Sequence, residues 1–385
     1  MQRPELSLTL PARLHWSRFP LRLALTTHAI LLALGVMLAW RSGVVHSACH
    51  WDCEWYSAIA RSGYGALVKS GPEALPGQGS WAFFPLFPLA MRLVSAVTTL
   101  NVAAAGLLLN AVSLPILLWL TFDWTRKRHG IRDARFFCLF FLLYPLGLWF
   151  RLPYSETLFG LTLMLCLTRL QAGALLQAGV AGALMTAARP TGAPILFVLA
   201  VAHVLTAMKN NRQNEAAMLR KAGGSSLGDA VAESAALVAI GVSGLAAYML
   251  YLHHTTGDAL AFSHVQSGWG RHFNNPLSHI AAGMRLPHAA TLVPFAVIEP
   301  IVLIWAFAVG FRIESAILGV TWLLSVSTGL NSIYRIVPAN PLMIVVFWRA
   351  ARSLNTTWKW GALGLFAIFD IIIGILWIHG KSTLA

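Results

Sequence analysis

Long apolar runs, separated by short polar segments, repeat along most of the chain. An apolar run of about 20 residues is long enough to cross a bilayer as a helix, and residues 21–40 form the first such run. The further runs lie at residues 101–124, 136–150, 154–170, 171–188, 193–208, 230–252, 291–311, 314–330, 337–348 and 361–379. The pattern predicts an all-α polytopic membrane protein, a single domain over residues 1–385 with about eleven transmembrane helices.

Basic residues between the apolar runs predict how the helices cross the membrane. Lysine and arginine are enriched in the short cytoplasmic loops of membrane proteins. If the N-terminus is cytoplasmic, alternation of the spans places these basic segments on that side: residues 1–20, 126–135, 209–221 and 349–352. Residues 41–100 and 253–290 then form two large outer loops. The first contains an aromatic, proline-broken run at residues 83–88 and is expected to carry helices that lie along the interface.

Composition supports this class and limits the others. Hydrophobic residues make up 57% of the chain and charged residues 11%, whereas soluble domains contain about 25% charged residues. The net charge is +14, but the basic residues gather in short loops, so nucleic acid is not expected as a partner. Cys138 and Cys166 lie in apolar runs, and Cys49 and Cys53 flank a polar loop at a spacing that fits no strong metal or redox motif. We interpret all four as structural residues and do not expect a disulfide in the loop.

Charged and polar residues collect at the outer ends of the predicted helices. Charges near membrane depth are costly and persist mainly where they face a cavity or a partner. The residues placed there are Asp52, Glu54, Arg151, Tyr154, Glu156, Arg189, Arg271, Tyr334 and Arg335. Because guanidinium groups match phosphate oxygens, arginines around one or two carboxylates indicate a site for an anionic, phosphate-bearing substrate. For any single arginine, the alternative is a side chain that simply extends to the membrane interface.

The sequence His-Trp-Asp-Cys-Glu-Trp-Tyr at residues 50–56 places two carboxylates between aromatic residues just beyond the first span. Aromatic rings stack on the apolar faces of sugars or anchor a protein at the interface, and a carboxylate among them can accept a proton from an attacking hydroxyl. The residue types alone leave two interpretations, a catalytic site or an interfacial aromatic belt with solvated acids.

Several short motifs, in a common order, resemble one family of membrane enzymes. They are the loop at residues 50–64 with Phe-Phe-Pro-Leu-Phe-Pro at 83–88, Pro-Tyr-Ser-Glu-Thr-Leu-Phe at 153–159, Ala-Arg-Pro-Thr-Gly at 188–192, and Thr-Gly-Asp-Ala-Leu-Ala-Phe at 256–262 followed by Gln266, Trp269 and Arg271. The set is similar to the GPI mannosyltransferase II (PIG-V) family and its bacterial relatives, which are glycosyltransferases of the GT-C type. Cys53 and Ala259 replace a small residue and a proline of that pattern, and Tyr334-Arg335 reverses its Arg-Tyr pair.

The resemblance implies a GT-C-like helical bundle that transfers mannose or a similar hexose, with inversion, at the periplasmic face of a bacterial inner membrane. The donor would be a sugar linked to a polyprenyl phosphate, and the acceptor a hydroxyl of a glycan, glycolipid or protein; membrane lipids are the other partners. Asp52 would be the general base, with Glu54 in reserve. The arginines expected to bind the donor phosphate are Arg189, Arg271 and Arg335. The other residues expected to contact substrate or hold the site are Trp51, Tyr56, Arg151, Tyr154, Glu156, Gln266, Trp269 and Tyr334.

No metal or other cofactor is expected, because phosphate is already a fair leaving group. The histidines of the second outer loop, together with Asp258, lack the spacing of a metal motif. His46 and His50, four residues apart and near Glu54, leave a zinc site as an alternative.

Two other functions compete with the enzyme. A lipid or glycolipid transporter would also be a many-helix bundle, but it predicts acids and arginines near the middle of broken helices. Here Asp123, Glu299 and Asp370 are the lone acids that occupy or border spans. A non-catalytic subunit of a membrane assembly would need no acid at Asp52.

Overall fold

The computed structural model describes residues 19–65, 77–216 and 227–380. Within these residues the chain is helical and contains no strand, so the predicted all-α fold is confirmed. Five helical segments of this described part are long and apolar enough to cross a membrane. They are α1 (Leu21–Ala39), α5 (Val102–His129), the first part of α9 (Gly192–Ala216), the pair α10 (Leu227–Gly241) and α11 (Ser243–Thr256), and α19 (Thr356–Ile378). The chain is therefore a membrane protein.

The other predicted spans also coincide with helices. These are α6 (Ala134–Leu143), α7 (Glu156–Gln171), α8 (Leu175–Ala188), α15 (Val293–Ala308), α16 (Arg312–Thr328) and α18 (Pro341–Ala351). The predicted span 136–150 leaves the α-helix at Tyr144 and continues as the 3-10 helix η3 (Pro145–Phe150), because a residue before proline disfavours the α conformation. The predicted span 230–252 is divided at Val242, between α10 and α11. Two of the basic segments used to predict orientation lie partly or wholly outside the described residues, at positions 1–18 and 217–221.

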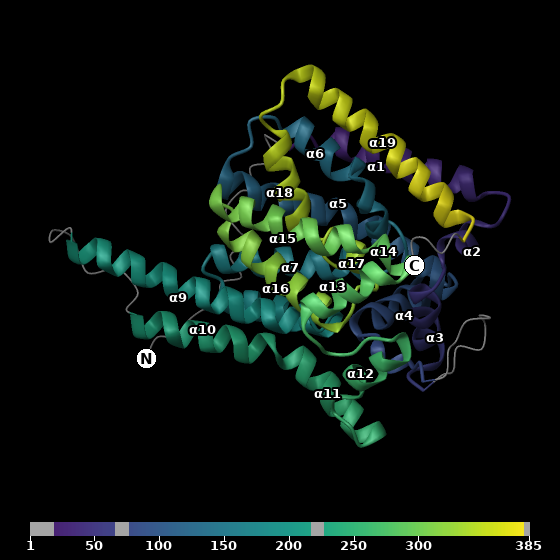
Figure 1. Cartoon of the computed structure of the whole chain (residues 1–385), viewed down its shortest axis with the longest axis horizontal. Helices are drawn as coiled ribbons and strands as arrows, with labels where there is room; N and C mark the ends of the chain where they lie inside the picture. Colours follow the sequence, from purple (N-terminus) through teal and green to yellow (C-terminus); the bar gives the residue numbers. More distant parts are fainter. Residues whose placement is uncertain (1–18, 66–76, 217–226, 381–385) are drawn as a thin grey trace.

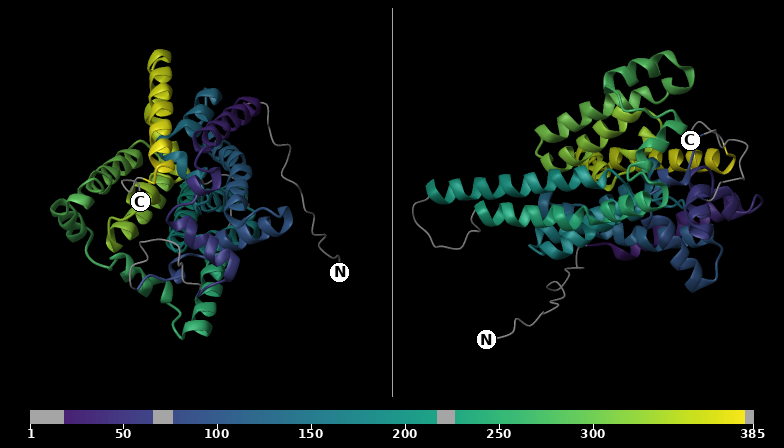
Figure 2. Two further views of the ribbon diagram at one scale, coloured as in Figure 1. Left: turned by 90° about the vertical axis from the view of Figure 1, so that its right-hand side faces the viewer. Right: turned by 90° about the horizontal axis from the view of Figure 1, so that it is seen from below.

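The two ends of the helical bundle differ (Figure 1). At one end α9 and α10 lie side by side and extend beyond the other helices, as Figure 1 and the right panel of Figure 2 both show. At the other end are short helices from the predicted outer loops. They are α2 (Val44–Ala48), α3 (Asp52–Ser62), η2 (Ser80–Ala82), α4 (Leu86–Thr98), α12 (Ala261–His264), η4 (Val265–Trp269), α13 (Pro276–Arg285), α14 (Pro287–Ala290) and α17 (Ile333–Ile336).

The main core lies where α5, α6, α7 and α18 meet. The side chains of Leu117, Phe137, Leu163 and Val345, one from each helix, are at most 1% exposed. A second buried cluster, which we call the aromatic cluster, lies beneath the short helices of the outer loops and contains several large aromatic side chains. It includes Cys53, Trp149, Tyr154, Tyr334 and Trp377. This aromatic cluster joins α3, η3, α17 and α19, so it fixes the first outer loop to the bundle.

Gly244 allows α11 to pack directly on α8. A Cβ atom at this position would lie 1.9 Å from the carbonyl oxygen of Ala183. Because that oxygen belongs to a helix backbone, Gly244→Ala is expected to push the two helices apart and to reduce the free energy of unfolding by about 1–3 kcal/mol. Gly364→Ala in α19 is the matched control, since nothing lies within 4 Å of its Cβ position. Thermal unfolding in detergent measures both variants, and equal transition temperatures would contradict this packing.

Candidate active site

A cavity of about 280 Å³ is lined by residues of α3, the α8–α9 turn, the α12–η4 segment and the region from α16 to α17. These segments are distant in sequence and meet only in the folded chain. Seven of the residues nominated from the sequence line the cavity: Asp52, Tyr56, Arg189, Gln266, Trp269, Arg271 and Arg335. The cavity therefore combines a carboxylate, three arginines and aromatic rings on one surface.

Asp52 is the first residue of α3, where the helix N-terminus favours a negative charge. The residue before it, Trp51, has φ 48° and ψ −111°, a conformation that bulky residues rarely adopt. This sharp turn leads from α2 into α3 and places Asp52 at the cavity wall. The Asp52 side chain is 27% exposed, so its carboxylate is accessible to a ligand.

Two arginines and two carboxylates form a chain of ion pairs at this wall. Arg335 Nη2 donates a hydrogen bond to Asp52 Oδ2 at 2.5 Å, and Arg335 Nε lies 3.2 Å from Glu156 Oε1. The same Glu156 oxygen lies 2.5 Å from Arg189 Nη2. The Glu156 side chain is only 1% exposed. Glu156 therefore joins the two arginines from within the protein, and Asp52 is the accessible acid.

Charge pairing explains how Arg335 can remain charged although its side chain is only 12% exposed. Burial alone would lower the pKa of Arg335, but the carboxylates of Asp52 and Glu156 outweigh burial and raise this pKa well above its usual value. The guanidinium carbon of Arg335 also lies 5.0 Å from the ring centroid of Tyr154 and 5.4 Å from that of Trp149, which adds cation–π attraction. Arg335 is consequently a fixed positive charge beside Asp52.

Arg271 is arranged differently from the other two arginines. Its Nη2 donates a hydrogen bond to the carbonyl oxygen of Asn331. Among the described residues, no carboxylate lies within 4.0 Å of its guanidinium nitrogens. Burial and the charge of Arg335 lower the pKa of Arg271 to about 10, so it still carries its charge at neutral pH. Arg189 and Arg335 form ion pairs with carboxylates, whereas Arg271 forms none with the described residues, so Arg271 is the arginine of the cavity lining whose charge is left to act on a ligand.

Ser155 connects two of the lining side chains. Its Oγ accepts hydrogen bonds from Tyr56 Oη and from Arg189 Nε, each at 3.0 Å. Burial raises the pKa of Tyr56 to about 12, so the phenol keeps its proton at neutral pH. Ser155 was not nominated from the sequence, although it lies inside the motif at residues 153–159.

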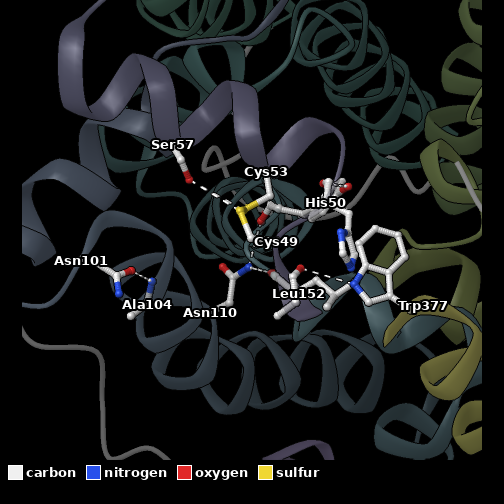
Figure 3. The surroundings of a disulfide bond; sticks show 11 residues. Cys49, His50, Cys53, Ser57, Asn101, Ala104, Asn110, Leu152 and Trp377 are labelled. Carbon is white, nitrogen blue, oxygen red and sulfur yellow. Dashed lines mark hydrogen bonds between the residues drawn. A yellow bond between two sulfur atoms is a disulfide. The ribbon is translucent and has the colours of Figure 1, made fainter. Parts of the chain in front are cut away.

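Asn110 of α5 holds the backbone at the start of the motif at residues 153–159. Its Nδ2 donates to the carbonyl oxygens of Leu152 and Tyr154, and Figure 3 shows the amide directed at Leu152. Asn110 is fully buried. Asn110 was not predicted from the sequence, although an amide side chain inside an apolar span is the signal that points to it.

The remaining nominated residues do not line this cavity: Trp51, Glu54, Arg151, Tyr154, Glu156 and Tyr334. Tyr154 supports the loop before α3, because its hydroxyl donates to the carbonyl oxygen of His50 at 2.8 Å. Trp51 packs against Trp377 of α19 with ring centroids 4.7 Å apart. Tyr334 is buried in the aromatic cluster.

Arg151 lies in a different environment from the one expected. Its Nη2 forms an ion pair with Asp370 of α19, and both residues line a separate, mostly apolar groove of about 300 Å³ between α1, α5 and α19. The expectation that Arg151 joins the outer site is therefore corrected, and Asp370 is not a lone acid. The predictions for Arg151 and Asp370 were based on their positions along the helices, and such a position does not determine the direction in which a side chain points.

The structure joins Cys49 and Cys53 in a disulfide, with the two Cα atoms 5.1 Å apart (Figure 3). The expectation of no disulfide in this loop is therefore wrong. α2 ends at Ala48 and α3 begins at Asp52, and the turn between them brings the two sulfurs together, which the spacing alone does not reveal. Cys138 and Cys166 are free and buried.

The histidines near the outer loops were the candidates for a metal site. In the described part of the chain, no three His, Cys, Asp or Glu side chains lie close enough together to hold a metal ion. His264 pairs with Asp258 at 2.7 Å on the surface. His46 and His50 were the residues of the alternative zinc site, and their ring centroids are 6.1 Å apart.

Comparison with known proteins gives a match only among solved structures. No family model matches the chain and no curated protein matches it, so the resemblance to the GPI mannosyltransferase II family rests on the short motifs. The chain is similar to the oligosaccharyltransferase AglB of the archaeon Archaeoglobus fulgidus. A structure of AglB with an inhibitory peptide and a dolichol-phosphate matches 94% of this chain at 13% identity with a TM-score of 0.43. The apo form matches 94% at 13% identity with a TM-score of 0.42, and the chain spans 56% of the length of each.

Proposed function

We propose that the protein is a GT-C-type membrane glycosyltransferase. It transfers mannose or a similar hexose, with inversion, from a polyprenyl-phosphate-linked donor to a hydroxyl acceptor. The observation that carries this proposal is an accessible carboxylate, Asp52, held by Arg335 in a cavity where Arg271 forms no ion pair with any described carboxylate. An accessible base and an unbalanced positive charge are the two elements that transfer from a phosphate leaving group requires.

Asp52 is the general base in this proposal. As the acceptor oxygen attacks the anomeric carbon, its proton passes to the Asp52 carboxylate. The new carbon–oxygen bond forms while the bond to the lipid phosphate breaks, and the bonding electron pair leaves on the phosphate oxygen. Arg335 orients the carboxylate through the 2.5 Å hydrogen bond to Oδ2. Glu54 does not line the cavity, which favours Asp52 over its neighbour.

Arg271 is the proposed ligand of the donor phosphate. The negative charge on that phosphate increases as the sugar departs, and a preorganised guanidinium stabilises it. Arg189 and Arg335 already contact carboxylates, so they add positive potential while Arg271 makes the direct contact. Gln266 and Trp269 line the same cavity and supply a hydrogen-bonding group and an aromatic face for the sugar.

The disulfide supports a periplasmic active site. Asp52 lies between Cys49 and Cys53, and disulfides persist in oxidising compartments rather than in the cytoplasm. This agrees with the orientation inferred from basic loops, in which the first outer loop faces the periplasm of a bacterial inner membrane.

A lipid or glycolipid flippase is the second candidate. The Arg151–Asp370 ion pair beside the membrane-spanning α1 and α19 favours it, because paired charges at membrane depth are typical of transport pathways. The two functions differ in chemistry, since a flippase leaves the bond between sugar and phosphate intact.

The direct test incubates the purified protein with a panel of polyprenyl-phosphate sugars and with hydroxyl acceptors. Release of free polyprenyl phosphate, measured by mass spectrometry, is expected with at least one sugar. Proteoliposome assays of lipid translocation run in parallel. Translocation of an intact donor, with no release of phosphate, would support the flippase and overturn the enzyme.

Arg271→Ala is expected to weaken binding of the lipid donor, and of polyprenyl phosphate itself, by about 10–100-fold. The reason is the loss of charge-assisted hydrogen bonds to phosphate from a residue that forms no ion pair with a described carboxylate. Arg285→Ala, an exposed arginine in the last turn of α13, is the control that removes the same charge elsewhere in this loop. Donor KM and a direct binding titration measure the effect. Unchanged donor affinity in Arg271→Ala would remove Arg271 from the phosphate site.

A further inference from the structure

The turn that presents Asp52 has a backbone conformation that needs support. Trp51, directly before Asp52, has φ 48° and ψ −111°, a region that non-glycine residues adopt mainly where their surroundings hold them there. The turn has few hydrogen bonds of its own: Cys53 N donates to His50 O at 3.1 Å, and Glu54 N donates to Trp51 O at 3.0 Å. Contacts from outside the turn must therefore contribute to its shape.

The disulfide is the covalent part of this support. Cys49 is the C-cap residue of α2, and Cys53 lies in the first turn of α3, so the bond closes the turn on both sides of His50, Trp51 and Asp52. Ser57 Oγ lies 3.7 Å from Cys49 Sγ and 3.8 Å from Cys53 Sγ, and Figure 3 shows its side chain directed at the sulfurs. Cys53 is completely buried.

Trp377 supports the turn from the C-terminal helix. Its Nε1 donates to the carbonyl oxygen of Ala48 at 3.3 Å. Its ring packs edge-on against Trp51 and against His50, with centroids 4.7 Å and 5.7 Å away. Figure 3 shows the indole beside the His50 ring. The turn is thus held between a covalent bond and a buried aromatic side chain.

The short length of the loop that the disulfide closes indicates that the bond acts on local conformation more than on the stability of the whole protein. The cysteines are four residues apart, and a crosslink across so short a loop restricts the unfolded chain much less than a long-range one. The main effect of this bond is then on the conformation of the residues that it encloses. Asp52 is one of them, and it is adjacent to Cys53.

We infer that the Cys49–Cys53 disulfide is a positioning device for Asp52 that makes sugar transfer depend on the oxidised state of the loop. This inference rests on the proposed role of Asp52 as general base. Reduction by dithiothreitol adds two electrons and two protons, breaks the sulfur–sulfur bond to give two thiols, and converts dithiothreitol to its cyclic disulfide. Cys49 is the partly exposed member of the pair, so attack begins at its sulfur. The freed turn relaxes at Trp51, and the carboxylate leaves its position against Arg335.

The test compares Cys49→Ala/Cys53→Ala with Cys138→Ala/Cys166→Ala, which removes the two buried free cysteines and keeps the disulfide. The first variant is expected to lose about 10²-fold in kcat, since a small misplacement of a reacting group has effects of this size. Its donor KM and its transition temperature should stay near those of the wild type. The control should keep full activity. Dithiothreitol should reduce kcat of the wild type and of the control, reversibly on reoxidation, and should not affect the first variant.

Hydrogen exchange of the wild type before and after reduction gives a readout that does not need catalysis. Amides of residues 49–56 should exchange faster after reduction, while those of α5 and α7 stay protected. If no donor is consumed under any condition, the proposed function fails, but faster exchange confined to this segment still supports the positioning role. Unchanged exchange at residues 49–56, wild-type kcat in Cys49→Ala/Cys53→Ala, or free thiols at both positions in the purified protein would each overturn the inference.

Discussion

Replacement of Asp52 by asparagine is expected to reduce sugar transfer by about 10²–10⁴-fold, the usual contribution of a general base. The amide has nearly the shape of the carboxylate but cannot accept a proton from the acceptor hydroxyl. Arg335 keeps Glu156 as an anionic partner 3.2 Å away, so the protein should still fold. Initial rates of polyprenyl phosphate release, with thermal unfolding as a check on folding, measure the effect.

Asp258→Asn is the matched control for this substitution. Asp258 also lies in an outer loop, but it pairs with His264 on the surface and does not line the cavity. The control should transfer sugar at the wild-type rate. Wild-type turnover in Asp52→Asn would remove Asp52 from the mechanism.

Glu156→Gln is expected to reduce the free energy of unfolding by about 3–5 kcal/mol, as does the loss of one partner from a buried ion pair. The Glu156 side chain is 1% exposed and its Oε1 lies within 3.2 Å of nitrogens of both Arg189 and Arg335. Of the carboxylates that the structure describes, the neutral amide would leave none paired with Arg189 and Asp52 alone paired with Arg335. Thermal or denaturant unfolding in detergent measures the loss.

Two further variants separate charge from shape at Glu156. Glu156→Asp keeps the charge on a shorter side chain and should lose less stability than Glu156→Gln. Glu233→Gln in α10 is the exposed control, because the Glu233 side chain is 44% exposed and contacts only His203 among the ion pairs of the described residues; exposed pairs contribute about 0–1 kcal/mol. If Glu156→Gln unfolds at the wild-type temperature, the buried network does not stabilise the protein.

The spans could be predicted from the sequence because a bilayer imposes both the length and the apolar character of a helix. Their interruptions were less visible. The end of α6 at Leu143, one residue before the C-cap Tyr144, follows from Pro145 and is a local effect. The break at Val242 lies where α10 and α11 pack against α8, with Gly244 in close contact with Ala183. The number of apolar residues in a run predicts a span but gives no information about a tertiary contact of this kind.

The site was predictable only in part for a related reason. The positions of Asp52, Arg189, Arg271 and Arg335 along the chain placed them at the same end of their spans, and the structure brings them to one cavity. Position along a helix does not determine rotation about its axis. The same reasoning therefore grouped Arg151 with them, although its side chain pairs with Asp370 in another groove.

The pairing pattern within the site was also beyond the sequence. Arg335 contacts Asp52 and Glu156, which are far from it along the chain, so only the fold distinguishes it from Arg271. This difference changes the expected roles. In the proposed mechanism, Arg335 holds the base in place and Arg271 binds the phosphate.

The most direct measurement is an experimental structure of Asp52→Asn in complex with a polyprenyl-phosphate sugar, in lipid nanodiscs. The proposal predicts the phosphate within hydrogen-bonding distance of Arg271, the sugar beside Trp269, and the anomeric carbon facing residue 52. A donor bound instead in the groove of Arg151 and Asp370, with its phosphate remote from Arg271, would contradict it.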